Sequence, residues 1–384
     1  MDLNLVDERV IAKYKKEAVD SNRGSWYLSY CMDLNQEERE RGKTQEISFT
    51  TFDLPTCRIN VIDSPGHKTY VNEMIEGAAR AETGILIVSA RQGEFESGFK
   101  GGQTKEHVRL LKAANVRQLI ILVNKMDEVE WSSERYSFIA GKISKFTDVL
   151  FPKAPIIPVS GFLGDNISKS KKLDFYKGGT FLEYLDTMPL SQADQQGEGT
   201  VATVVEKVKS ANTYFFVRLE RGILQKGSEY LILPCNKKDK VVSLQNYEEI
   251  EVEKADPIDL YRVKLAKVSE EISIGSKLLM DAISYRNANL IYAKMGIYDV
   301  NRPITVGYSM VFHCGLQSSL CKIESLYGIN KKPIRVVKKA EKAIVLLRLE
   351  TTLVLQSTKG SRDRFSLRDE DRTIGVGEVS KIVE

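Results

Sequence analysis

The chain has 384 residues, of which 42% are hydrophobic and 28% are charged, and its formal net charge is +4. This length exceeds what one hydrophobic core usually supports, so we expect two or three domains, and the small net charge does not by itself indicate nucleic-acid binding. Five cysteines without paired spacing indicate a reducing compartment rather than a disulfide framework. The N-terminus has no basic start followed by an apolar run, and no stretch of about eighteen apolar residues occurs, so we expect a cytoplasmic protein without a membrane span.

The first motif in chain order lies in residues 38–47, ERERGKTQEI, which contain the three letters Gly42-Lys43-Thr44 that close a phosphate-binding P-loop. A full P-loop needs another glycine five residues before Gly42, because its backbone N–H groups fold around a phosphate, and Glu37 stands there. The preceding stretch is polar and acidic, unlike the buried strand that leads into a P-loop. No other segment has the required spacing, so the sequence predicts no P-loop.

Short β-branched apolar runs alternate with helical patterns up to about residue 190. The predicted strands are residues 58–63, 85–90, 119–124 and 156–160, and the predicted helices are residues 69–81, 103–114, 133–150 and 180–188. This alternation favours parallel strands covered by helices on both faces.

A polar linker at residues 189–199 is followed by short strand-like runs separated by Gly, Asn and Asp. Such runs are typical of small antiparallel barrels. A second change of pattern near residues 281–289 predicts another barrel that extends to the end of the chain. We therefore predict three domains: an α/β domain over residues 1–190 and two antiparallel β-barrels over residues 197–283 and 284–384.

The segment DSPGH follows the predicted strand 58–63 and places Asp63 three residues before Gly66. An aspartate at the carboxyl end of a strand can hold a Mg²⁺-bound water, and the glycine lets a backbone N–H reach a γ-phosphate. Taken alone, this short pattern favours the alternative of a tight turn containing Pro and Gly.

A second strand, residues 119–124, ends in NKMD, which brings Asn124, Lys125 and Asp127 to an edge where α/β sheets bind ligands. The Asp127 carboxylate can accept hydrogen bonds from N1–H and N2–H₂ of guanine, which adenine cannot supply, and the Lys125 stem can lie along the purine. The next strand ends at Ser160-Gly161, whose N–H groups can reach guanine O6. Three motifs in this order, each after an apolar strand, favour a guanine nucleotide site over unrelated capped loops.

These motifs, followed by two β-domains, resemble the translational GTPases of the elongation factor Tu and elongation factor one-alpha type. Within that group the class II release factors, the GTP-binding subunits of eukaryotic peptide chain release factors, are the most similar. The matching stretches are residues 25–47, 63–82, 85–107, 181–188 and 364–383. The resemblance implies a P-loop NTPase-like α/β GTPase domain that lacks its first strand and P-loop here, followed by two β-barrels.

The resemblance also implies roles for the residues of the first domain. It places residues 38–47 in switch I and makes Thr44 the family's Mg²⁺-binding threonine, with Asp63 as a further residue at the Mg²⁺ site. Gly66 is then the sensor of the γ-phosphate, and His67 positions the attacking water on the ribosome. The implied cofactors are GTP and Mg²⁺.

Family members carry a first strand, a phosphate loop and a helix before the region that matches the start of this chain. Without them, a triphosphate is largely unheld, so GTP binding and hydrolysis by these residues are in doubt. Loss of the central strand is also expected to expose apolar edges on the strands at residues 58–63 and 85–90. We therefore favour a segment upstream of Met1 over natural loss of the loop.

The resemblance further implies two partners for a monomer: a class I peptide chain release factor and the ribosome with its GTPase-activating centre and ribosomal RNA. The predicted residues of the class I factor interface are Arg364, Phe365, Arg368 and Asp369. A simple edge strand and turn are the alternative for this segment. The basic run at residues 331–342 fits either contact with ribosomal RNA or a solvated face.

We predict a translation termination factor that delivers the class I release factor to the ribosome at stop codons and promotes peptide release. A ribosome-rescue GTPase, which carries a release-factor-like protein to stalled ribosomes, is an alternative, because NKMDEVEW is compact as in that paralogue. By contrast, GKTQEI and SLRDE favour the release factor. A non-enzymatic adaptor that binds the release factor is the third hypothesis.

Overall fold

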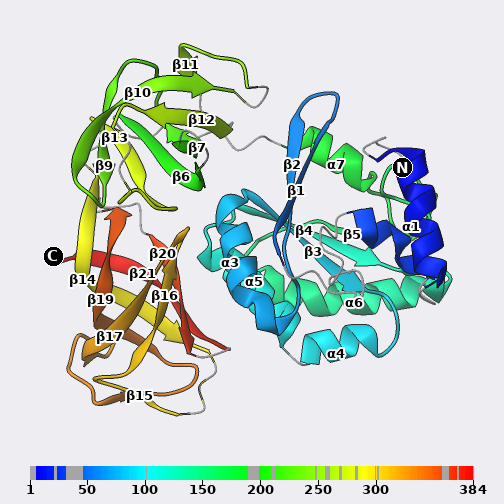
Figure 1. Ribbon diagram of the computed structural model, residues 1–384. Coiled ribbons are helices and arrows are strands. Elements are labelled where there is room, and N and C mark those ends of the chain that lie inside the picture. Colours follow the sequence, from blue (N-terminus) through cyan, green and yellow to red (C-terminus); the bar gives the residue numbers. More distant parts are fainter. Residues whose placement is uncertain are drawn as a thin grey trace. The chain divides into compact units, whose positions relative to one another are not determined.

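A computed structural model describes residues 6–20, 24–31, 46–100, 102–188, 199–209, 213–246, 249–255, 260–267, 270–281, 284–298, 300, 302–356, 363–369 and 372–383. The chain divides into two compact units, Met1–Pro189, here called the α/β unit, and Leu190–Glu384, here called the barrel unit (Figure 1). Within the described ranges, no helix is both long and apolar enough to cross a membrane.

The α/β unit contains helices and strands in alternation. They are α1 (Glu8–Asp20), η1 (Gly24–Cys31), β1 (Ser48–Asp53), β2 (Arg58–Asp63), η2 (Lys68–Tyr70), α3 (Val71–Arg80), β3 (Thr83–Ser89), α4 (Glu94–Lys100), α5 (Gln103–Ala113), β4 (Gln118–Asn124), η3 (Met126–Val129), α6 (Ser133–Thr147), β5 (Ile156–Pro158) and α7 (Phe181–Thr187).

Strand β4 is the centre of a parallel sheet with the order β3-β4-β5 (Figure 1). Its alternate side chains enter two different cores. Ile121 and Val123 pack in a cluster with residues of α3, α5 and α6, whereas Ile120 and Leu122 pack in a second cluster with Leu185 of α7. A strand that is apolar at every position can be buried on both faces, as the run LIILV is. The predicted α/β layering is therefore confirmed for this sheet.

The strand at residues 58–63 differs from the prediction of a parallel strand. It forms β2, which pairs antiparallel with β1 in a separate two-stranded sheet, from Ser48 opposite Asp63 to Asp53 opposite Arg58. A tight turn closes this hairpin, in which the Leu54 N–H donates to the Cys57 carbonyl over 2.8 Å. Pairing across so short a loop costs little chain entropy, so the local partner is favoured.

The outer edge of β3 pairs with no other described strand. Leu86 and Val88 are 6% exposed on the side of the core, but Ile85 and Ile87 on the other side are 41% and 60% exposed. The predicted apolar edge is thus confirmed for this strand.

The barrel unit holds two closed six-stranded barrels. The first barrel has the order β10-β12-β7-β6-β13-β9, and the second has the order β14-β19-β17-β16-β20-β21. The strands of the first are β6 (Thr200–Lys209), β7 (Thr213–Arg221), β9 (Glu229–Leu233), β10 (Lys237–Gln245), β12 (Leu260–Leu265) and β13 (Lys277–Met280). Those of the second are β14 (Tyr285–Ile297), β16 (Ser309–Cys314), β17 (Gln317–Tyr327), β19 (Lys342–Gln356), β20 (Arg364–Asp369) and β21 (Arg372–Ile382).

Each barrel carries a small two-stranded sheet beside it. In the first, β8 (Leu224–Gln225) pairs with β11 (Lys254–Ala255), and in the second, β15 (Ile304–Thr305) pairs with β18 (Val336–Val337). Closure of each main sheet leaves it no free edge, which protects a β-rich unit from pairing with other chains.

An apolar cluster and a polar cluster join the two barrels. Val201 and Leu279 of the first barrel share a buried cluster with Val354 of the second. Beside it, the Lys277 ammonium lies 2.9 Å from a carboxylate oxygen of Glu220, and the Tyr285 hydroxyl of the second barrel donates to Glu220 over 3.5 Å. The junction is therefore held by apolar burial together with an ion pair.

Removal of one member of this ion pair is expected to destabilise the barrel unit. The Lys277 side chain is 12% exposed, so Lys277→Met leaves the Glu220 carboxylate without its main counter-charge. We expect a loss of about 2 to 4 kcal/mol, most of which the double variant Glu220→Gln/Lys277→Met regains. Urea unfolding followed by circular dichroism measures this loss. Tryptophan fluorescence would not report on the barrel unit, because both tryptophans, Trp26 and Trp131, lie in the α/β unit.

The same pair predicts the pH dependence of this difference. Burial opposes ionisation of Glu220, but the charges of Lys277 and Arg218 dominate and lower the pKa of its carboxyl from 4.5 to about 2. A lowered pKa stabilises the fold above the unfolded-state value and ceases to do so as pH falls through the folded-state value. The stability difference between the wild type and the double variant should therefore change between about pH 4.5 and pH 2. A difference that is constant over this range contradicts the proposed ion pair.

Candidate functional site

The carboxyl ends of β3, β4 and β5 meet at one edge of the sheet, and backbone hydrogen bonds join the segments that follow them. The Ala90 N–H after β3 donates to the Asn124 carbonyl over 2.7 Å, and the Met126 N–H donates to the Val159 carbonyl over 3.2 Å. Ligands of α/β sheets bind at such an edge. The NKMD and SG motifs are thus neighbours in space.

The side chain of Asn124 ties the loop after β4 to the loop after β5. Its Oδ1 accepts from the Lys125 N–H over 2.7 Å and from the Gly161 N–H over 2.8 Å. A Cβ at position 161 would lie 3.3 Å from the amide of Asn124, so glycine allows this close approach. Asn124 therefore positions both of the loops that the sequence assigns to guanine.

Lys125 has a left-handed backbone with φ 63°, which is uncommon for a residue other than glycine. Its ammonium lies 2.8 Å from Oε2 of Glu94, the first residue of α4. Hydrogen bonds from Lys125 and then from Ser89 lower the pKa of the Glu94 carboxyl to about 2, against a smaller effect of burial. Lys125 is therefore held at the edge of the site by a carboxylate at the start of α4.

Glu94 and its neighbour Arg91 are residues that the sequence prediction missed. The Arg91 guanidinium lies 3.0 Å from Oε1 of Glu94 and also pairs with Glu128. The stretch RQGEFE contains no motif with an assigned chemistry. The available signal was the adjacency of the predicted strands at residues 85–90 and 119–124, because loops that follow adjacent parallel strands lie close enough for long side chains to pair.

Asp127 lies in η3, and its carboxylate makes no hydrogen bond to a described residue, although its backbone carbonyl accepts from the Glu130 N–H over 3.2 Å. The N–H groups predicted to reach guanine O6 are both used inside the protein. The Ser160 N–H donates to the Asp165 carbonyl over 3.0 Å, and the Gly161 N–H donates to Asn124. The Asp127 carboxylate is thus available to accept from N1–H and N2–H₂ of guanine. The Ser160 and Gly161 N–H groups can reach guanine O6 only if their present hydrogen bonds to Asp165 and Asn124 break.

The DSPGH segment is fixed separately, after β2. The backbone carbonyl of Gly66 accepts from the side-chain amide of Gln103 at the start of α5. Nδ1 of His67 accepts from the Thr69 N–H over 3.3 Å, so the neutral imidazole carries its proton on Nε2. Asp63 ends β2 and is half-buried.

The structure thus brings together one group of predicted residues and places a second group on another sheet. Asn124, Lys125 and Asp127 adjoin Ser160 and Gly161 through the bonds described above. Asp63, Gly66 and His67 lie on or after the β1-β2 hairpin, which is not paired with the three-stranded sheet in the described residues. Thr44 lies outside the described residues.

The residues fit a guanine base better than they fit a triphosphate with its metal. Asp127 has a free carboxylate edge for the base within the described residues. The 384 residues contain no P-loop sequence for the phosphates. No group of three or more His, Cys, Asp or Glu side chains in the described part of the chain is arranged to hold a metal ion. No chemical step through GTP or Mg²⁺ follows from this geometry.

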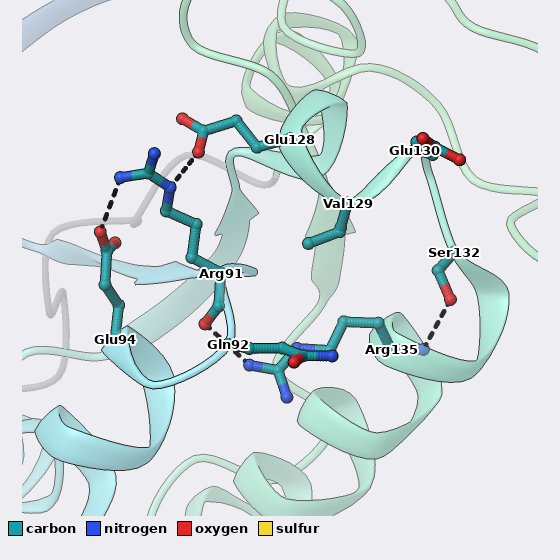
Figure 2. Close-up of a pocket in the computed structure, with 8 residues that line it drawn as sticks. All are labelled: Arg91, Gln92, Glu94, Glu128, Val129, Glu130, Ser132 and Arg135. Carbon is teal, nitrogen blue, oxygen red and sulfur yellow. Dashed lines mark hydrogen bonds and ion pairs between the residues drawn. The ribbon is translucent and has the colours of Figure 1, made fainter.

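A cavity of about 530 Å³ lies beside this edge, between the loops after β3 and β4 (Figure 2). Its lining comprises Arg91, Gln92, Glu94, Glu128, Val129, Glu130, Ser132 and Arg135. Arg135 donates to the carbonyls of Ala90 and Arg91 over 2.7 and 2.8 Å, and Arg91 is paired with carboxylates. Both guanidinium groups are therefore engaged in holding loops, and Asn124 and Asp127 do not line the cavity.

The predicted partner face lies on β20, and two of its four predicted contact residues are buried. Phe365 is fully buried and stacks on Phe312 with ring centroids 4.6 Å apart, and Arg368 is 5% exposed. Both side chains support the barrel and offer no surface to a partner. Arg364 and Asp369 are half-buried, so both can still contact a partner and remain predictions. Four successive residues of β20 are buried, so the strand has no alternation of inward and outward side chains from which its exposed face could be predicted.

Comparison with known families matches nearly the whole chain. Residues 4–286 match the family described as Elongation factor Tu GTP binding domain, and residues 285–383 match Elongation factor Tu C-terminal domain. Among solved structures, the S. cerevisiae Ski7 GTPase-like domain, bound to GTP, is similar with a TM-score of 0.78 and 19% identity over 99% of this chain and 92% of that one. A bacterial selenocysteine-specific elongation factor has a TM-score of 0.65 and 22% identity over 91% of this chain and 53% of that one. Both similarities concern the fold alone.

Curated relatives carry one recurrent name. The Kluyveromyces lactis protein named Eukaryotic peptide chain release factor GTP-binding subunit is 34% identical over 99% of this chain and 57% of its own length. The Schizosaccharomyces pombe protein of the same name is 32% identical over 99% of this chain and 60% of its own length. The chain therefore spans 57% to 60% of the length of these two relatives. These matches confirm the predicted resemblance and fold class.

Replacement of Asn124 should loosen the loop after β5 selectively. Asn124→Ala removes the acceptor of two N–H groups, at a cost of about 1 to 3 kcal/mol, whereas Asn124→Asp keeps a side-chain oxygen at the same place. We expect faster hydrogen exchange of the Gly161 amide in Asn124→Ala and near-normal exchange in Asn124→Asp. Hydrogen exchange resolved to residues 159–164 measures this, and equal protection of Gly161 in all three proteins refutes the assigned role.

Proposed function

The chain belongs to the elongation factor Tu GTP-binding family, and on this premise we propose that it acts in translation termination as the partner of a class I peptide chain release factor. The observation that carries the proposal is the 34% identity to a release factor GTP-binding subunit over 99% of this chain. In this role it delivers the class I factor to ribosomes at stop codons and promotes peptide release. The place of action is the cytoplasm, and the protein acts there as a monomer.

The proposed partner face lies on the second barrel. Arg364 and Asp369 stand at the two ends of β20, and the Asp369 carboxylate is held by the Tyr308 hydroxyl. A partner contact here needs no exposure of the barrel core. We propose three functional domains, residues 1–190, 197–283 and 284–384. The class I factor binds the third domain, and the GTPase-activating centre of the ribosome faces the first.

The proposed base site is the edge formed by Asn124, Lys125 and Asp127 with the Ser160-Gly161 loop. Asp127 selects guanine through its carboxylate, and Asn124 positions the two loops. By resemblance to the family, Thr44 and Asp63 belong to the Mg²⁺ site. Gly66 senses the γ-phosphate, and His67 positions the attacking water.

A second function is favoured by one observation: these 384 residues contain no P-loop for a triphosphate. This second hypothesis is a non-enzymatic adaptor that binds a release factor through its barrels, and GTP binding by these residues decides it. The ribosome-rescue paralogue is the remaining alternative, and it differs in the partner that it carries.

Partner choice separates termination from rescue. We expect residues 1–384 to capture a purified class I release factor at least about tenfold more tightly than a release-factor-like rescue protein, a difference of about 1.4 kcal/mol. Arg364→Glu should weaken this binding, because it reverses a charge at the proposed face. The control variant is Lys381→Glu, which makes the same charge change at an exposed site on β21, outside the proposed face. Tight binding to the rescue protein alone overturns the termination proposal.

Nucleotide binding separates a GTPase from an adaptor. Because the phosphates have no P-loop, we expect GTP with Mg²⁺ to bind these residues no more than about tenfold more tightly than GMP, as measured by calorimetry. We also expect both dissociation constants to exceed about 10 µM. Asp127→Asn should shift any residual preference from guanine to xanthine, because the amide can donate to the C2 carbonyl of xanthine. Micromolar or tighter GTP binding contradicts the adaptor.

A further inference from the structure

The second barrel carries a dense set of exposed cations in and next to the small β15-β18 sheet. Residues 331–342 hold six lysines and arginines and one acid, Glu341, and β15, which follows Arg302, pairs with β18 inside this segment. We call these seven exposed side chains the basic ribbon: Arg302, Lys331, Lys332, Arg335, Lys338, Lys339 and Lys342. Seven cations against one carboxylate leave a charge of +6, compared with +4 for the whole chain, so the rest of the protein is slightly negative.

The basic ribbon is fixed to the barrel. Val337 and Ile304 are fully buried in the barrel core, and Ile334 packs against it. Backbone bonds fasten both ends of the segment: the Gly328 N–H donates to the Lys332 carbonyl and the Ala340 N–H donates to the Ile297 carbonyl, each over 2.9 Å. The cations therefore extend from a defined backbone, and their concentration in space does not depend on a mobile tail.

Six cations of the ribbon, all except Lys339, form no ion pair with a carboxylate in the part of the chain that the structure describes. The Glu341 carboxylate accepts from the Lys338 backbone N–H over 2.7 Å. The acidic stretch of the first barrel behaves differently, because Glu249 pairs with Arg262 and Glu251 pairs with Lys226. These two acids of the first barrel are thus paired with cations of the same barrel, whereas six cations of the ribbon have no such partner among the described residues.

We propose that the basic ribbon binds the phosphate backbone of RNA. Phosphates are the recurring anions that a fixed row of lysines and arginines neutralises, with release of condensed counterions. Tyr327, which forms a backbone bridge with Pro333 of this segment, and Tyr292 are half-buried, with ring centroids 6.4 Å apart, so this pair offers no open platform for base stacking. Binding is therefore sequence-independent and salt-sensitive.

RNA fits this surface better than a bilayer does. Only Ile329 and Val306 are strongly exposed apolar side chains among the described residues beside the ribbon, at 59% and 53%. Stable membrane association requires a larger apolar face in addition to basic charge. Membership of a translation factor family favours RNA over DNA as the nucleic acid. The inference does not depend on which partner protein the chain carries.

The test compares two variants of the full chain that lose equal charge. The ribbon variant is Lys331→Gln/Lys332→Gln/Arg335→Gln/Lys338→Gln, and the control variant is Lys145→Gln/Lys153→Gln/Lys172→Gln/Lys177→Gln, at exposed positions of the α/β unit. Fluorescence anisotropy with a labelled RNA hairpin and a single strand of equal length, at several KCl concentrations near 100 mM, gives the dissociation constants and their salt slope. Thermal unfolding verifies that both variants fold.

We expect the ribbon variant to bind either RNA at least about tenfold more weakly at about 100 mM salt, with a slope of log K against log salt reduced by about three. The control variant should bind within about twofold of the wild type. Equal weakening of both variants, or wild-type binding that is independent of salt, overturns the proposal. So does binding to phosphatidylserine vesicles in the absence of RNA binding.

Discussion

The burial of β4 on both faces is the constraint on which the α/β unit depends. Every residue of its run LIILV packs into one of two cores, and the strand therefore has a single position between α5 and α7. Asn124 is the last residue of this strand, so its side chain emerges at a fixed place. From there one amide oxygen joins the loops after β4 and β5. The geometry of the proposed base site therefore follows from hydrophobic packing.

The proposed base site and the phosphate site of the family have separate physical origins. The proposed selection of guanine needs one carboxylate and two positioned loops, and both follow strands of the three-stranded sheet. Phosphate binding needs a nest of backbone N–H groups and a lysine, and no segment with that sequence is present. The Glu94 carboxylate at the start of α4 pairs with both Lys125 and Arg91, so it joins the segment after β3 to the loop after β4.

Much of the architecture could be predicted from the sequence, because hydrophobic periodicity is local. The strands at residues 85–90 and 119–124 and the two barrels followed from apolar runs and turn residues. The antiparallel pairing of β2 could not be predicted in this way, since a run such as RINVID does not reveal which neighbour it will pair with. Long-range polar contacts were equally hidden. The pairing of Lys125 with Glu94 depends on two loops that are distant in sequence, and Phe365 lies in a strand buried on both faces.

The two kinds of sheet in this protein treat their edges in opposite ways. The barrels close upon themselves, whereas β3 keeps seven residues of its outer backbone without a described strand partner and carries Ile85 and Ile87 outward. Such an edge is a template on which another extended chain can add. In concentrated solution, self-association of these 384 residues should therefore begin at this strand while both barrels are still intact, and a lysine in place of Ile87 should act as a gatekeeper against it.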